Sequence, residues 1–459
     1  MADLVIKNGI VVTSQGLVRG GLAVEGGKIA QVSGDMTLPS AKQEVDAGGN
    51  YILPGMIDPH VHLGMAATGR GEDKFRADFA SESASAAIGG VTTMITTAYF
   101  SGAGRSLLPC IARSKEIGAQ QSLIDFKFSA MMMTSVHLTE IPKLFEAGVT
   151  SFKFFPVYRG EEGRQVGVTE EIGWDYIYKG MEGANKCGPQ ALSMIHAEEP
   201  GIIDVLRQRF KEQGRNDPRA WAESRPGICE AMHIFSGGLT ALELGARVYF
   251  VHVSAKESVE AIQYFKRKGA QLYGETCPHY LLLTKDSEIG VLGKVNPPLH
   301  EAEDNRQIWR GLQDGTFDAI GSDHSSNLRW QKEKGDIWST MPGFPTIGAS
   351  LALLVSEGVN KGRLSWEQLA RVTSENTARI FGLYPRKGTL APGADADIVI
   401  VDPNREWELN AENLKSASDY SIYAGKVAKG KAVKTFVRGK LVADDGRAVA
   451  QGSHGVYVA

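Results

Sequence analysis

Eight short apolar segments alternate with helical stretches through the middle of this 459-residue chain. Such alternation is typical of βα units arranged around a parallel sheet. The predicted strands are residues 56–63, 92–97, 125–131, 151–155, 191–196, 248–253, 271–276 and 318–323. Eight repeats favour a closed (β/α)₈ barrel of the TIM type. An open doubly wound sheet is the alternative, but no G-x-G-x-x-G motif follows the first strand.

The two ends of the chain share a different pattern of short strands and tight turns. Residues 1–53 contain a hairpin signal at Gly26-Gly27. A similar pattern returns only in residues 388–459. We therefore expect one small β-sandwich domain formed by both termini, with the barrel domain occupying residues 54–387 between them.

Composition excludes several classes of protein. Apolar residues make up 42% of the chain and charged residues 22%, which is ordinary for a soluble globular enzyme. The formal net charge of -3 gives no reason to expect a nucleic acid or an anionic membrane as partner. The chain shows no secretory signal and no apolar run near the roughly 18 residues of a membrane helix, so we expect a cytoplasmic protein. The four cysteines are scattered, which disfavours disulfides and a thiolate zinc site.

Metal-binding residue types gather at the ends of the predicted strands. His60 and His62 are two apart, so on a strand both imidazoles point to the same side. Three more candidates end later strands, namely His196, His252 and Asp323. A single histidine at such a position is more often structural. However, barrel active sites lie at the carboxyl ends of the strands, and joint placement there predicts a metal centre.

Lys153 lies on the fourth predicted strand, between aromatic residues. Burial disfavours a charged ammonium group. The lysine could pair with a carboxylate, form a Schiff base, or add carbon dioxide to give a carbamate that bridges two metal ions. Four histidines and an aspartate at the same strand ends favour the carbamate, because a Schiff-base enzyme needs no metal ligands.

These motifs together resemble the cyclic-amidase branch of the amidohydrolase superfamily, which includes hydantoinases, dihydropyrimidinases, allantoinases and dihydroorotases. The similarity covers nearly the whole chain. It is carried by Asp58-Pro-His-Val-His62, Ser151-Phe-Lys153, Ile195-His-Ala-Glu198, Val251-His-Val-Ser254, Gly274-Glu-Thr-Cys-Pro-His-Tyr280, Gly321-Ser-Asp-His324 and residues 387–397.

The resemblance implies a binuclear metal hydrolase that opens a cyclic amide, ureide or imide. One metal ion would be held by His60, His62, carboxylated Lys153 and Asp323, and the other by the same carbamate with His196 and His252. Nitrogen and oxygen ligands suit Zn²⁺, with Mn²⁺, Co²⁺ and Fe²⁺ as alternatives. A hydroxide bridging the two ions would attack the ring carbonyl, with Asp323 as general base.

Four residues are implied as substrate contacts. Tyr158 matches the tyrosine that stabilises the oxyanion in hydantoinases. Asn296 replaces a serine of the hydantoinases, whose segment contacts the ring imide largely through backbone groups. Gly343 replaces an asparagine and leaves only a backbone contact. Arg70, in the loop after the first strand, is either a contact to a polar ring substituent or a solvated charge. This more polar loop predicts a small polar substrate.

Dihydroorotases carry an arginine two positions after the H-x-H motif, where this chain has Gly64. The hydantoinase or dihydropyrimidinase function is therefore favoured over allantoinase and dihydroorotase. A non-catalytic scaffold is the rival from another class, and it is disfavoured because all six ligand positions are filled. The resemblance also implies a homo-oligomer, either a dimer or a tetramer.

Overall fold

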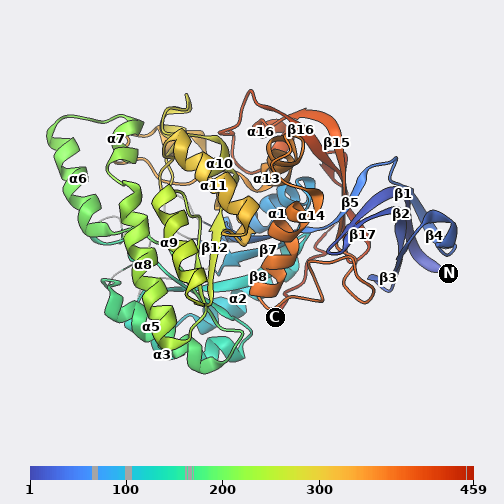
Figure 1. Cartoon of the computed structure of the whole chain (residues 1–459), viewed down its shortest axis with the longest axis horizontal. Coiled ribbons are helices and arrows are strands. Elements are labelled where there is room, and N and C mark those ends of the chain that lie inside the picture. The colour runs from blue at the N-terminus through green and yellow to red at the C-terminus, as the bar shows by residue number, and fades with distance from the viewer. Residues whose placement is uncertain (65–70, 99–105, 161–162, 164–167, 169, 451) are drawn as a thin grey trace.

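The computed structural model describes residues 1–459 apart from 65–70, 99–105, 161–162, 164–167, 169 and 451. A barrel forms the larger part, and a β-sheet built from the terminal segments lies to one side of it (Figure 1). The barrel strands are β6 (Met56–His62), β7 (Val91–Thr97), β8 (Asp125–Met132), β9 (Ser151–Phe154), β10 (Leu192–Ile195), β11 (Val248–Phe250), β12 (Leu272–Thr276), β13 (Ala319–Ile320) and β14 (His324–Ser325). They pair in chain order and all are parallel.

The eighth predicted strand is split in two, and this split closes the barrel. β13 pairs with β12, while β14 begins only a few residues later and pairs with β6. The last strand therefore joins the first, so the predicted barrel is confirmed. The expectation that Asp323 lies at the end of the eighth strand is wrong. Asp323 lies in the turn between the two halves, where its φ of 49° takes the backbone out of extended geometry.

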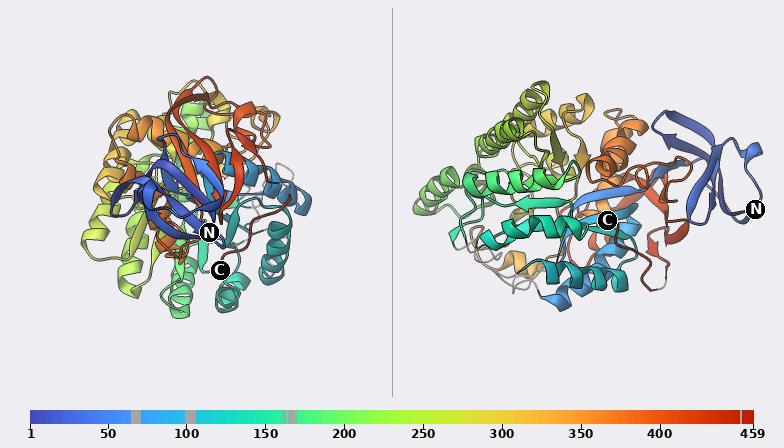
Figure 2. Two further views of the ribbon diagram at one scale, coloured as in Figure 1. Left: turned by 90° about the vertical axis from the view of Figure 1, so that its right-hand side faces the viewer. Right: turned by 90° about the horizontal axis from the view of Figure 1, so that it is seen from below.

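Helices cover the outside of the barrel (Figure 2). The α-helices of the described residues are α1 (Glu72–Ile88), α2 (Leu108–Gln121), α3 (Ser135–Glu146), α5 (Trp174–Cys187), α6 (Pro200–Glu212), α7 (Pro218–Glu223), α8 (Gly227–Leu244), α9 (Lys256–Arg267), α10 (Pro278–Leu282), α11 (Ala302–Asp314), α12 (Arg329–Glu333), α13 (Ser350–Leu354), α14 (Trp366–Ala370), α15 (Asn376–Ile380) and, between two strands of the terminal segment, α16 (Ala411–Leu414). In α9, Val259, Ile262 and Phe265 are buried at helical spacing. In the parts of the chain described here, no helix is both long and apolar enough to cross a membrane.

Both termini contribute to one β-sheet, as predicted. Its strands are β1 (Ala2–Thr13), β2 (Gly16–Glu25), β3 (Lys28–Ser33), β4 (Ala41–Asp46), β5 (Tyr51–Pro54), β15 (Ile398–Glu408), β16 (Val427–Val437), β17 (Lys440–Asp444) and β18 (Arg447–Ala448). β5 pairs with β15, which places Ile52 opposite Ile400. Both isoleucines are buried in the same apolar cluster, so the segments stabilise one another across the sequence.

A buried ionic network joins this sheet to the barrel. Lys387 Nζ lies 2.6 Å from Asp125 Oδ2 and 2.6 Å from Asp397 Oδ2. Arg438 also donates to Asp125. Asp125 begins β8, so the network lies at the end of the barrel away from the strand carboxyl ends. Cationic side chains already neutralise this cluster of carboxylates, which makes it an ionic connection between domains.

Candidate active site and metal centre

A cavity of about 570 Å³, including its open mouth, lies where the barrel strands end. Its wall includes most of the predicted metal ligands and substrate contacts. These are His62, Lys153, His196, His252, Asp323, Tyr158, Asn296 and Gly343. His60 lies against this wall through its contacts with His62 and Asp323. Arg70 falls outside the described residues.

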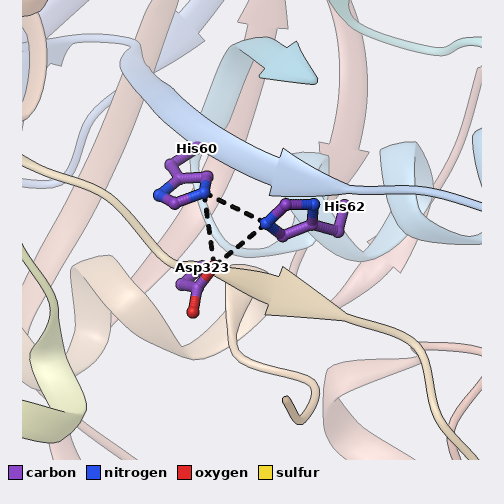
Figure 3. Close-up of side chains that lie close together, drawn as sticks. All are labelled: His60, His62 and Asp323. Carbon is purple, nitrogen blue, oxygen red and sulfur yellow. Dashed lines mark hydrogen bonds and ion pairs between the residues drawn. The ribbon is translucent and has the colours of Figure 1, made fainter. Parts of the chain in front are cut away.

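Two histidines and a carboxylate converge on one point (Figure 3). His60 Nε2 lies 3.1 Å from His62 Nε2. Asp323 Oδ1 is 3.3 Å from His60 Nε2 and 3.2 Å from His62 Nε2. The spacing of two on β6 brings both imidazoles to one side, and the turn before β14 brings the carboxylate to them. Three donor atoms that face one another in this way can share a cation.

Lys153 reaches the same point from β9. Its side chain is buried, and Nζ lies within hydrogen-bond distance of His60 Nε2. Nζ also lies 4.8 Å from the centre of the Phe155 ring. The amine is therefore held beside the predicted ligands and against an apolar surface.

His196 and His252 lie on the other side of the cluster. Their ring centres are 4.4 Å apart, and the His252 ring is 5.2 Å from that of His60. His196 Nε2 pairs with Glu198 Oε2 at 2.7 Å, which leaves Nδ1 as the ring nitrogen for another ligand. His252 Nδ1 is buried and has no hydrogen-bond partner among the residues that the structure describes.

The structure corrects where these two histidines lie on their strands. β10 ends at Ile195, so His196 follows the strand instead of closing it, and His252 lies beyond the end of β11. The backbone of His252 has a φ of 42°, in the left-handed region that non-glycine residues rarely adopt. Holding a non-glycine residue in this conformation costs about 1–3 kcal/mol of folding free energy, and such residues cluster at functional sites. Asp323 shares this conformation, so two predicted ligands are held by strained turns.

The buried histidines are poised to bind as neutral imidazoles. Burial lowers the pKa of His60 and of His252 well below the ordinary value, and it lowers the pKa of His196 in the same direction. The charge of Lys153 adds to the effect on His60. Neutral imidazole nitrogen and carboxylate oxygen are the donors that divalent transition metals accept. The residues present therefore fit a metal centre.

Two buried glutamates hold the histidines, and neither has a role in the predictions from the sequence. Glu275 Oε1 lies 3.0 Å from His60 Nδ1 and accepts the backbone N–H of His252 at 3.0 Å. Tyr249 donates to Glu275 Oε2 at 2.8 Å. Burial raises the pKa of Glu275 to about 8. Because Nδ1 of His60 is engaged, its Nε2 is the nitrogen that faces the cluster.

Glu198 holds His196 and is itself held by Arg225. Arg225 Nη1 donates to both carboxylate oxygens at 3.0 Å. Burial would raise the pKa of Glu198, but the charge of Arg225 and the hydrogen bond with His196 lower it to about 2. Both glutamates lie within the motifs quoted above, but only Glu198 lies two positions from a predicted ligand, His196, so its spacing was the one signal that could have identified a partner.

The substrate side of the cavity includes Tyr158, Asn296 and Gly343. Burial raises the pKa of Tyr158 to about 12, so its hydroxyl remains a donor at neutral pH. Gly343 has a φ of 92°, which favours glycine. Its N–H donates to Lys294 O at 3.0 Å, and its carbonyl accepts from Lys332 Nζ at 2.8 Å. Its backbone groups thus already have partners in the chain.

The fold and this cluster define a class of protein, a (β/α)₈ barrel with a candidate metal centre at the carboxyl ends of its strands. Comparison with known proteins gives the family. The model of the amidohydrolase family matches residues 51–442. The chain therefore belongs to the amidohydrolase family, whose members are metal-dependent.

Relatives match over nearly their whole length. A D-hydantoinase of Ralstonia pickettii is 34% identical, with 99% of this chain and 98% of the relative covered. An L-hydantoinase of Paenarthrobacter aurescens is 33% identical, with 100% and 98% covered. The solved dihydropyrimidinase from Brevibacillus agri NCHU1002 has a TM-score of 0.91 and 31% identity, with 100% of this chain and 98% of that chain covered.

Proposed function

We infer that this protein is a cyclic amidohydrolase of the hydantoinase and dihydropyrimidinase type, which hydrolyses the amide bond of a small cyclic amide. Relatives named for these activities match it from end to end. The observation that carries the proposal is one cavity wall in which Tyr158 and Asn296 accompany His62, Lys153 and Asp323. A hydrogen-bond donor for a carbonyl oxygen and a set of metal ligands suit hydrolysis of an unactivated amide.

Two divalent metal ions, of which Zn²⁺ is the proposed native metal, would be held by the predicted residues. One set is His60, His62, Lys153 and Asp323, and the other is Lys153, His196 and His252. When bound, the ions would polarise the ring carbonyl and make hydroxide available at neutral pH. Lys153 would serve both sets only after carbon dioxide has added to its neutral amine to give a carbamate, because the amine offers a single lone pair whereas a carbamate offers two oxygens. The contact between Lys153 and His60 supports this role.

The chain's own residues would move the protons and hold the ring. Asp323 takes the proton of the attacking water and returns it to the departing ring nitrogen. Tyr158 donates its hydroxyl to the carbonyl oxygen as negative charge develops there. Asn296 contacts the ring, and Gly343 shapes the wall beside it. The proposed contact of Arg70 with a polar ring substituent stays a prediction.

An allantoinase-like or dihydroorotase-like ring is the alternative substrate. Among the described residues that line the cavity no arginine is present, and Lys153, the lysine among them, would be a carbamate. A carboxylate on the substrate would therefore lack a guanidinium partner, which favours a neutral ring. A non-catalytic scaffold is less favoured, because the predicted ligands lie around one cavity.

The test is ring opening of hydantoin, dihydrouracil, allantoin and dihydroorotate, each with and without a chelator, on protein of measured metal content. We expect chelator-sensitive opening of hydantoin or dihydrouracil by protein that holds two metal ions per subunit. Opening of none of the four rings by such protein would refute the proposed substrates. Protein that holds no metal and opens no ring would support the scaffold.

Three further predictions concern organisation. We propose a homo-oligomer of two or four subunits, which light scattering would measure. We also propose a cytoplasmic location, which cell fractionation would test. The proposed division at residues 1–53, 54–387 and 388–459 is supported by the pairing of β5 with β15.

A further inference from the structure

Asn296 is a buried polar side chain in the cavity wall, and among the described residues only its amide nitrogen has a hydrogen-bond partner. Nδ2 donates to the Tyr158 hydroxyl at 3.4 Å. Oδ1 is buried and lacks a hydrogen-bond partner within the described part of the chain. Leaving a buried acceptor unpaired costs about 1–3 kcal/mol. A ligand that donates a hydrogen bond to Oδ1 would remove this cost.

The backbone on both sides of Asn296 is fixed. Trp221 Nε1 donates to Val295 O at 3.1 Å, and the Tyr280 hydroxyl donates to Pro297 O at 2.5 Å. Both donors are buried. The side chain between these two anchors is therefore presented to the cavity from a rigid segment, which suits recognition of a specific group.

We propose that the Asn296 amide orients the Tyr158 hydroxyl and also recognises the N–H group beside the scissile carbonyl of the ring. This inference rests on the proposed function. Because Nδ2–H occupies a lone pair of the Tyr158 oxygen, the phenolic hydrogen is left to point to the substrate. In a small ring the amide is cis, so its C=O and N–H lie side by side on one edge. The Tyr158 donor and the Asn296 acceptor match that edge.

The charge state of Tyr158 agrees with this arrangement. Burial raises its pKa to about 12, and the hydrogen bond from Asn296 opposes the shift. The phenol therefore keeps its hydrogen at neutral pH, and only the direction in which it points is open. Asn296 is thus a positioning residue for Tyr158 and a specificity-determining residue for the ring nitrogen.

The positioning half is tested by Asn296→Asp, which keeps the size and the acceptors but loses the N–H donor. The new carboxylate would accept the Tyr158 O–H and turn it away from the substrate. Removal of one oxyanion donor costs about 10²–10³ in kcat. We expect Asn296→Asp and Tyr158→Phe each to lower kcat by about this factor, with KM changed only a few-fold and the metal content unchanged. The double variant should lose no more than either single variant.

The recognition half is tested by binding, which requires no turnover. Calorimetry on chelator-treated, metal-free protein, which would not turn hydantoin over, would compare hydantoin with its analogue methylated on the nitrogen between the two carbonyls. One neutral hydrogen bond contributes about 0.5–1.5 kcal/mol, so the native protein should prefer the N–H ring by up to about tenfold. In Asn296→Ala, which also leaves room for the methyl group, this preference should disappear.

Different results contradict different claims. Full kcat in metal-loaded Asn296→Asp, or losses that multiply in the double variant, would overturn the positioning role. An unchanged ring preference in Asn296→Ala would overturn the recognition role. If the native protein opens no ring, the proposed function fails, whereas the binding comparison still decides between Asn296 and another partner for the ring nitrogen.

Discussion

Glu275→Gln should weaken metal binding without unfolding the protein. The carboxylate contacts the histidine ring of His60, the backbone of His252 and the hydroxyl of Tyr249. A glutamine keeps one oxygen for His60 and His252, and its amide can donate to the Tyr249 oxygen. The shape of the network survives, while a carboxyl group that can ionise beside His60 is replaced by a neutral amide.

The size of the effect follows from these contacts. Loss of a partner that orients a metal-binding histidine typically costs about 10–100-fold in metal affinity, which is roughly 1.4–2.7 kcal/mol. Glu275→Ala is harsher, because it leaves the buried Tyr249 hydroxyl and the His252 N–H without their acceptor. At about 1–3 kcal/mol for each group, it should also lower the free energy of unfolding by roughly 2–6 kcal/mol.

The assay is metal content per subunit after dialysis against graded chelator concentrations, with thermal unfolding measured on the same samples. Tyr249→Phe is the matched control, because it removes one contact of Glu275 and leaves His60 and His252 untouched. Its metal affinity should be close to native. If folded Glu275→Gln retains both metal ions as tightly as the native protein, then Glu275 does not act through the histidines.

Three other predictions use lysines. Lys153→Ala should lose both metal ions and activity, and a short carboxylic acid added in solution should restore part of each; two metal ions retained per subunit would contradict the carbamate. Lys387→Met should lower the free energy of unfolding in urea by about 3–5 kcal/mol without changing kcat, because Asp397 stays buried without a cation and Asp125 keeps only Arg438. The control Lys434→Met, which breaks a partly exposed pair, should cost about 0–1 kcal/mol. Burial lowers the pKa of Lys127 from 10.5 to about 8, so the unfolded chain binds more protons between these values. The contribution of Lys127 to stability should rise by roughly 3 kcal/mol from pH 8 to 10.5, and Lys127→Met should remove that contribution, as urea unfolding of both proteins at several pH values would show.

The barrel could be predicted because its strands are short, fully buried and separated by helices. β7 and β8 are buried along their whole length, which produces the apolar runs seen in the sequence. The shared terminal sheet was also predictable from its turn-rich pattern. The split of the last strand was not, because the turn at Asp323 depends on a backbone conformation that its side chain does not dictate.

The candidate ligands could be predicted from strand ends, but their supports could not. Glu275 and His60 are 215 positions apart, and Arg225 and Glu198 belong to different segments that meet only in the folded barrel. Local patterns show which side chains share a strand face, and they do not show which buried carboxylate pairs with which ring. Only the folded structure shows which partners orient each imidazole ring.

The strained turns show how such partners assemble the site. Among the described residues at the cavity, the two non-glycine residues with left-handed backbone, His252 and Asp323, are each next to a buried carboxylate contact. Glu275 accepts the N–H of His252, and Asp58 accepts the N–H of Ser322, which precedes Asp323, at 3.0 Å. Asp58 also accepts the N–H of His60 at 3.2 Å, and Glu275 holds the His60 ring. Each carboxylate thus connects a strained turn to β6, the first strand of the barrel. Asp58, two positions before His60, therefore has a structural role. It fixes the position of Asp323 relative to the two histidines before any metal ion is bound.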